Sequence, residues 1–221
     1  MSNKVWLKMD GINETIPNLT LDNAIFLGFM SMTRTYKILD FISGVEAFKK
    51  ITKLKEIMDI RLGSIADKDR GKNVRVLKKY YKLCGKLTDT ADYFDYKSLP
   101  EELVDKMYCA REVIPLWGYF SEFDYGNIET DDRKISKLAH IAKSGMITID
   151  NYLHSISDNL NQREREKEIE KNPLMLAEMR RVDEDVAFLK ANFDYENIVG
   201  YMEKYKTVDI FDMNTAKSIL D

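Results

Sequence analysis

The sequence is poor in the residues from which metal and catalytic sites are commonly built. It contains 2 cysteines and 2 histidines in 221 residues. A zinc site needs several Cys or His ligands at short spacings, whereas Cys84 and Cys109 each stand alone. His140 and His154 fall on one predicted helix and are about 21 Å apart along it. We therefore expect no metal, no cofactor and no catalytic centre, and we do not expect an enzyme.

Phosphate-binding loops and long apolar runs are missing as well. The 10 glycines form neither of the nucleotide-binding patterns G-x-x-x-x-G-K-[ST] and G-x-G-x-x-G. A membrane-spanning helix needs about 20 apolar residues, whereas the best stretch, 23–32, is followed by Arg34. Residues 1–10 carry no apolar signal segment, and unpaired cysteines suit a reducing compartment. We expect an intracellular protein that is not secreted.

Amphipathic helices dominate what is present. Apolar side chains recur at steps of three and four through most of the chain, which is the spacing of one helix face. The composition, 44% hydrophobic and 32% charged with 4 prolines, is enough for a packed core. The stripes and their flanking residues predict helices over 20–43, 47–62, 74–94, 98–117, 130–160 and 172–193.

These segments predict an all-α protein, an antiparallel helical bundle of about six helices. Thr20 and the pair Asn172-Pro173 are favourable helix starts. Pro115 should kink the fourth helix, because its ring removes one hydrogen bond and clashes with the preceding turn. We expect an N-terminal extension over 1–19, a bundle domain over 20–206 and a C-terminal tail over 207–221.

Two charged segments need no ligand or catalytic role to explain them. Residues 162–171, QREREKEIEK, form either a helix that projects into solvent or a linker. The acidic run at 183–185 lies beside Arg180 and Arg181 on a predicted helix. Solvated ion pairs are the expected role of that run.

One segment is distinguished by its positive charge. Residues 68–86 hold eight basic side chains and one acid, and the basic ones recur at helical steps. An apolar stripe lines the other side of the same helix, so the helix is basic and amphipathic. The candidate membrane or partner surface consists of Lys72, Arg75, Lys78, Lys79, Lys82 and Lys86.

Several partners suit such a helix: an anionic membrane, an acidic protein surface or nucleic acid. The overall excess of acidic residues disfavours nucleic acid. Another possibility lies within the chain, since residues 1–96 hold 17 Lys and Arg against 12 acids, and residues 97–221 hold 17 against 25. The basic face would then meet the acidic C-terminal half.

The order of the segments resembles that of the peroxisomal biogenesis factor eleven family, the membrane-elongating peroxins. The resemblance is carried by KILDFISG (37–44), KNVRVLKKYYKLCG (72–85), IPLWGYFSEFD (114–124), a polar connector after Leu160 and DVAFLKANFDYENIVGYM (185–202). It implies a non-enzymatic helical protein associated with an organelle membrane, in the peroxisome or mitochondrion. It also implies that the helix around 72–86 contacts and curves that membrane.

The leading hypothesis is a non-catalytic helical scaffold or accessory protein that acts through a membrane or protein-partner surface. One alternative is a soluble accessory subunit of a larger complex, for example an organellar one, with no membrane contact. Another is a helical-bundle ligand-binding protein or enzyme. Its pocket would lie near Trp117, Tyr119 and Phe120, beside the kink at Pro115.

Overall fold

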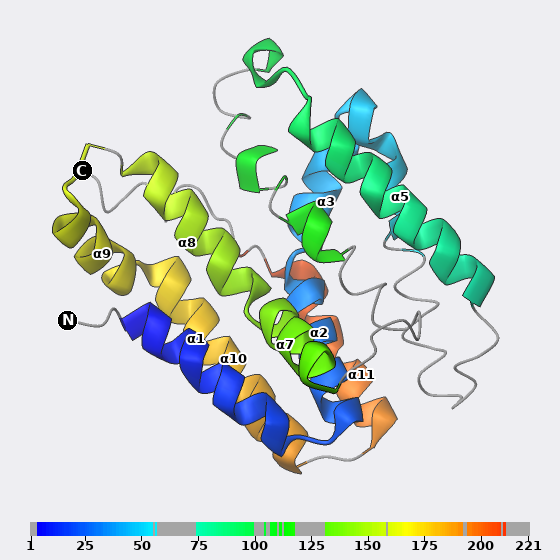
Figure 1. The fold of residues 1–221 in the computed structure, drawn as a ribbon, viewed down its shortest axis with the longest axis vertical. Helices are drawn as coiled ribbons and strands as arrows, with labels where there is room; N and C mark the ends of the chain where they lie inside the picture. Colours follow the sequence, from blue (N-terminus) through cyan, green and yellow to red (C-terminus); the bar gives the residue numbers. More distant parts are fainter. Residues whose placement is uncertain are drawn as a thin grey trace. The chain divides into compact units, whose positions relative to one another are not determined.

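Every regular element in the described part of the computed structural model is a helix (Figure 1). The predicted all-α class is therefore confirmed. The chain divides into two compact units, a first unit of Met1–Thr35 with Leu138–Asp221 and a second unit of Tyr36–Lys137. The structure describes residues 4–54, 56, 74–99, 104, 107–109, 111, 113–117, 131–157, 159–191, 194–208 and 210.

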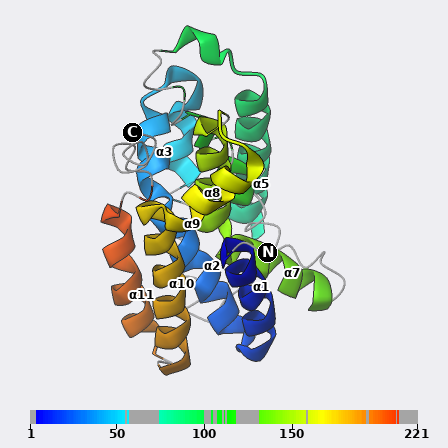
Figure 2. The ribbon, with the colours of Figure 1, turned by 90° about the vertical axis from the view of Figure 1, so that its left-hand side faces the viewer.

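The first unit is organised around one long helix, α10, which contacts α1, α2, α8 and α9 (Figures 1 and 2). Met175, Val182 and Leu189 are buried along α10 at steps of seven residues, so one face of the helix lies in the core. The elements of this unit are α1 (Lys4–Thr15), η1 (Ile16–Asn18), α2 (Leu21–Arg34), α8 (Ser144–Ile156), α9 (Gln162–Lys171), α10 (Pro173–Ala191), α11 (Tyr195–Glu203) and η4 (Lys204–Thr207).

Side-chain caps fix several helix starts in this unit. The Thr20 hydroxyl accepts a hydrogen bond of 3.2 Å from the backbone N–H of Asn23, and α2 follows. The Asn172 amide oxygen accepts one of 2.9 Å from the N–H of Leu174, and α10 begins at Pro173. Both predicted starts are confirmed. Asn161 caps α9 in the same way, so the charged segment 162–171 is a helix and not a linker.

Two predicted helices are divided in the structure. Residues 20–43 form α2 and α3 (Tyr36–Ser43), with Thr35 between them. Thr35 donates both its N–H and its hydroxyl to the Met32 carbonyl oxygen, at 2.9 and 2.6 Å, which tightens the last turn of α2. Residues 130–160 similarly form α7 (Asp131–Ala142) and α8, with Lys143 between them.

The second unit contains α3, η2 (Glu46–Ile51), α5 (Val74–Asp92), η3 (Tyr96–Ser98) and helical residues 113–117. Its core includes Phe48, whose ring centroid is 5.3 Å from that of Phe94. The predicted helix 47–62 starts as the 3-10 helix η2, and the helix continues at 52–54 and 56. Residues 57–62 lie outside the described part, and the predicted kink at Pro115 stays a prediction.

The predicted N-terminal extension contains a packed helix. Val5, Met9 and Ile12 of α1 are buried, and α1 contacts α10 and η1. Of the predicted C-terminal tail, residues 211–221 lie outside the described part. The predicted domain boundaries remain predictions.

Candidate functional site: a lysine-lined groove

Helix α5 turns an apolar side to the core of the second unit and a basic side to solvent. Its buried residues Tyr80, Cys84, Leu87 and Ala91 recur at steps of four, three and four, so they share one face. The Tyr80 hydroxyl donates a hydrogen bond of 3.0 Å to the Trp117 carbonyl oxygen. This anchored face fixes the rotation of α5 about its axis, and with it the side on which the lysines lie.

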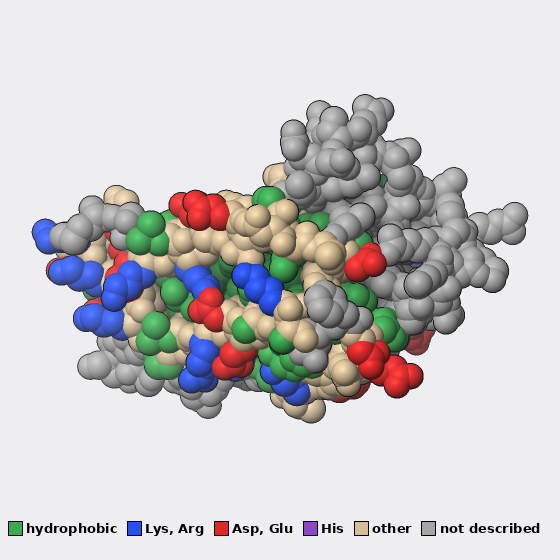
Figure 3. Space-filling model, turned by 90° about the horizontal axis from the view of Figure 1, so that it is seen from below, with side chains coloured by type: hydrophobic (Ala, Val, Ile, Leu, Met, Phe, Trp, Pro, Cys, Tyr) green, Lys and Arg blue, Asp and Glu red, His purple; other side chains and the backbone are tan. Residues whose placement is uncertain are grey.

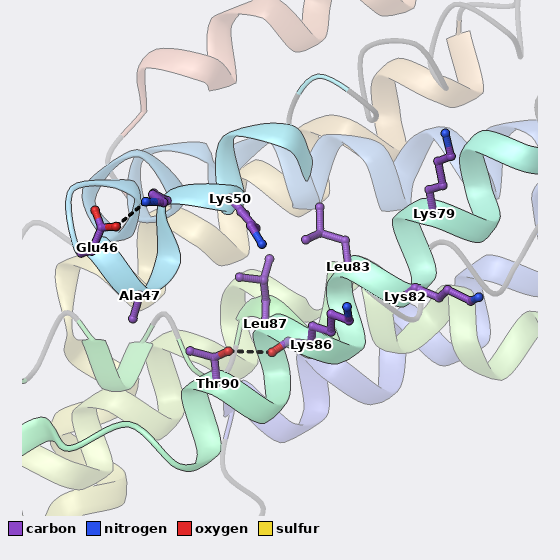
Figure 4. Close-up of a pocket in the computed structure, with 10 residues that line it drawn as sticks. Glu46, Ala47, Lys50, Lys79, Lys82, Leu83, Lys86, Leu87 and Thr90 are labelled. Carbon is purple, nitrogen blue, oxygen red and sulfur yellow. Dashed lines mark hydrogen bonds and ion pairs between the residues drawn. The ribbon is translucent and has the colours of Figure 1, made fainter.

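A groove of about 540 Å³ lies between α5 and η2 (Figure 4). Leu83 and Leu87 point from α5 toward η2 and give the groove an apolar floor, while Lys50 points from η2 toward α5. We call this feature the lysine groove. It is lined by Glu46, Ala47, Lys49, Lys50, Lys79, Lys82, Leu83, Lys86, Leu87 and Thr90.

The lysine groove carries an excess of positive charge. Of the ten described residues that line it, five are lysines and one is an acid, Glu46, which forms an ion pair with Lys49 one turn away. No ion pair joins the other four lysines to any described residue. Like charges gathered at an apolar surface repel one another, so an anionic ligand in the groove would be stabilised.

Half of the predicted contact surface is found in this groove, namely Lys79, Lys82 and Lys86. Lys72 lies outside the described residues, and Arg75 and Lys78 belong to α5 but their side chains are outside the described part. Lys49 and Lys50 were not among the predicted contact residues. The pair is visible in the sequence, but its position opposite α5 depends on tertiary packing.

Elsewhere the described charges are mixed in sign. On the face shown in Figure 3, Lys and Arg side chains are interspersed with Asp and Glu side chains. Many of the ion pairs join residues three or four apart on one helix, such as Lys171 with Glu168 and Arg180 with Glu184. Such exposed pairs contribute little to stability and leave no net charge. The groove differs from these surfaces because its lysines outnumber its acids.

The acidic run at 183–185 is not uniformly exposed. Asp183 and Glu184 are exposed and pair with Lys8 and Arg180, as the prediction of solvated ion pairs requires. Asp185 is fully buried and pairs with a cation on α2. For Asp185 the prediction was wrong, because its partner is 151 residues away in the sequence and no local pattern reveals it.

Arg34 is the centre of a buried polar cluster in the first unit, which we call the Arg34 cluster. Its Nε donates a hydrogen bond of 2.9 Å to Glu178 Oε1, and its Nη1 pairs with Asp185 Oδ2. The Tyr205 hydroxyl donates to Asp185 Oδ1. The side chains of the three charged residues are 0% exposed. The cluster therefore ties α2 to α10 and η4.

The pKa values in the Arg34 cluster are set by burial and by mutual attraction. Burial lowers the pKa of Arg34, but the charges of Glu178 and Asp185 raise it by more, so it lies above its usual value. Burial raises the pKa of Asp185 by more than Arg34 and Tyr205 lower it. Because these groups are enclosed by protein, we assign the cluster a structural role.

The histidines do not form a shared site. His140 is on α7 and His154 is on α8. His154 Nδ1 lies 2.9 Å from the Asp150 carbonyl oxygen and 3.4 Å from its Oδ2. Within the residues that the structure describes, no three His, Cys, Asp or Glu side chains gather as metal ligands would.

The alternative pocket was predicted around Trp117. The Trp117 side chain is fully buried, and its ring centroid is 5.4 Å from that of Tyr36. Tyr119 and Phe120 lie outside the described residues. A pocket at this place therefore stays a prediction.

Among the described helices, none has both the length and the apolar character needed to cross a bilayer. Comparisons with protein-family models, curated proteins and solved structures found no match. The resemblance to membrane-elongating peroxins thus rests on the sequence segments alone.

Proposed function

We propose that this protein is a non-catalytic helical scaffold or accessory protein that binds an acidic protein partner through the lysine groove. The observation that carries the proposal is the set of lysines around an apolar floor, where Glu46 is the one acid among the described lining residues. Opposite charge on a partner would speed association and set its orientation. Leu83, the partly exposed leucine of the floor, would add apolar contact that slows dissociation of the complex.

The concave shape favours a protein partner over a flat membrane. Leu83 and Leu87 lie at the floor, between the lysines of α5 and those of η2. A planar bilayer would meet the lysine ammonium groups first and leave this floor uncovered. A convex protein segment reaches both the lysines and the partly exposed Leu83.

Membrane shaping is the second candidate function. The segment 72–85, which resembles the basic helix of membrane-elongating peroxins, includes Lys79 and Lys82. This version predicts flotation with vesicles that contain anionic lipid, at a peroxisomal or mitochondrial membrane in the cell. Nucleic-acid binding, which the acidic composition disfavours, predicts steeply salt-dependent retention on DNA.

We also propose the finer architecture that the sequence predicts. It is an antiparallel bundle of about six main helices, with a kink near Pro115 in the fourth. The short helices α1 and α11 extend this plan at the two ends of the first unit.

Zero-length carbodiimide cross-linking tests the proposed function, because it joins a lysine to a carboxylate only where the two are in contact. The full chain is treated in an extract of its native cell, and both ends of each cross-link are mapped by mass spectrometry. We expect Lys79, Lys82 or Lys86 joined to Asp or Glu of one protein, which then binds the purified chain.

Exposed lysines outside the groove, Lys53 and Lys97, are the internal controls. Equal cross-linking at these controls and at the groove would contradict the proposal. Binding of the purified partner that persists after the groove lysines are changed to glutamate would also contradict it.

A further inference from the structure

The lysine groove runs along about three turns of α5. Its lining residues on that helix extend from Lys79 to Thr90, which corresponds to about 16 Å at the rise of an α-helix. Lys79 and Lys86 are seven residues apart, so two helical turns separate them. This length exceeds that of a single phosphate or carboxylate group, so the groove suits an elongated ligand that carries several negative charges.

The groove presents charge on two sides and apolar surface between them. Lys49 and Lys50 stand on η2, and the other lysines stand on α5. Leu83 is partly exposed at the floor, where Figure 4 shows it pointing toward η2. A complementary ligand has a central apolar stripe with acidic residues on both flanks.

The groove offers few partners for an extended peptide backbone. Apart from the lysines, the polar residues among the described lining are Glu46, which is paired with Lys49, and Thr90. The Thr90 hydroxyl already donates a hydrogen bond of 2.7 Å to the Lys86 carbonyl oxygen. An extended strand would therefore gain few backbone hydrogen bonds from the described lining, whereas a helix satisfies its own backbone groups and needs none.

From this geometry we infer that the occupant of the lysine groove is an acidic amphipathic helix of about three turns. Its apolar stripe lies on Leu83, which is partly exposed whereas Leu87 is buried, and its flanking carboxylates face the lysines of α5 and η2. This inference rests on the proposed function and specifies the partner's binding segment.

A synthetic peptide tests the inference on the full-length protein. The probe is a fluorescein-labelled peptide of about 14 residues, with leucine at helical steps of three and four and glutamate at most other positions. We expect saturable binding by fluorescence anisotropy that weakens as salt is added. A scrambled peptide of the same composition keeps the charge and loses the stripe, so it should bind at least about tenfold more weakly.

Two variants separate the contributions of charge and floor. Changing Lys79, Lys82 and Lys86 to glutamate should weaken binding of the probe by about tenfold or more, because attraction becomes repulsion. The matched control makes the same change at three exposed lysines of the second unit that do not line the groove, Lys37, Lys53 and Lys97. Leu83→Asp should also weaken binding, whereas Leu176→Asp, at an exposed leucine outside the groove, should not. Circular dichroism confirms that each variant is folded.

The outcomes distinguish failure of the inference from failure of the proposed function. Equal binding of the probe and the scrambled peptide would overturn the amphipathic helix but keep an anion-binding groove. Binding to phosphatidylserine vesicles without binding to the probe would overturn the inference and favour a membrane surface as the ligand of the groove. If neither the probe nor the vesicles bind, the inference fails; the proposed function fails as well if cross-linking at the groove lysines equals that at Lys53 and Lys97.

Discussion

Removal of the Arg34 guanidinium should be one of the most damaging single changes in the first unit. Arg34→Met keeps much of the side-chain volume but leaves Asp185 buried without its cation, and leaves Glu178 with only Arg181, whose Nη1 is 3.5 Å from Glu178 Oε2. Breaking a fully buried ion pair by removing one partner costs about 3–5 kcal/mol. We expect the free energy of unfolding to fall by that amount, because both carboxylates are 0% exposed and water does not reach them.

Urea unfolding followed by far-UV circular dichroism measures this loss. Arg163→Met is the matched control, because Arg163 is an exposed arginine on α9, and its loss should cost less than about 0.5 kcal/mol. A triple variant that also carries Glu178→Gln and Asp185→Asn should be more stable than Arg34→Met alone, since no buried charge remains unpaired. A loss below about 1 kcal/mol for Arg34→Met would refute the reasoning.

The pH dependence of the same variant follows from the pKa of Asp185. Burial raises that pKa above 3.8 in the folded protein, against the opposing effect of Arg34. A raised carboxyl pKa favours folding at acidic pH, and this contribution is lost as the pH rises through the folded-state value. Removal of Arg34 raises the pKa further, so the loss of stability should be largest at neutral pH and should shrink on acidification. A loss that does not vary with pH would show that the carboxylates do not sense Arg34.

Three further predictions concern single positions. Burial raises the pKa of Cys84 to about 12, and a side-chain hydrogen bond with Tyr80 opposes the shift. In a variant that lacks Cys109, Cys84 should therefore react with a disulfide reagent at pH 8 only after the protein unfolds. Gly145→Ala should lower the free energy of unfolding in urea by about 1–3 kcal/mol, because the new Cβ would lie 2.2 Å from a buried Glu178 oxygen. Gly200→Ala is the control: its Cβ would meet nothing within 4 Å, so it should stabilise α11 by about 0.5–1 kcal/mol. Asn161→Ala removes the cap of α9 and should cost about 1 kcal/mol, measured in the same way.

Local sequence signals predicted the helices well and their interruptions poorly. The caps at Thr20 and Asn172 depend on residues at most three positions away, and both were identified. The division after α2 depends on Thr35, whose hydroxyl and N–H both bond to one carbonyl oxygen. Threonine is common inside helices and at their ends, so the apolar stripe that continues through it predicted a single helix.

The lysine groove was only half visible in the sequence for a different reason. Helical periodicity placed Lys79, Lys82 and Lys86 on one side of a predicted helix, and the structure places them along one groove. No periodicity relates that helix to Lys49 and Lys50, because η2 lies next to α5 only through packing of the second unit. The side chain of Asp185 was misjudged for the same reason.

The excess of basic residues in the N-terminal half of the sequence is paired within the chain at some positions and not at others. In the first unit, cations from the N-terminal half meet acids from the C-terminal half, as when Lys8 pairs with Asp183 and Arg34 pairs with Asp185. These pairs support intramolecular matching of the halves. The lysines of α5 that line the groove, although they belong to the same basic half, have no such pair among the described residues. Among the described residues, these lysines lie together around one groove with an apolar floor, so we propose that a partner binds at the groove and not at the Arg34 cluster.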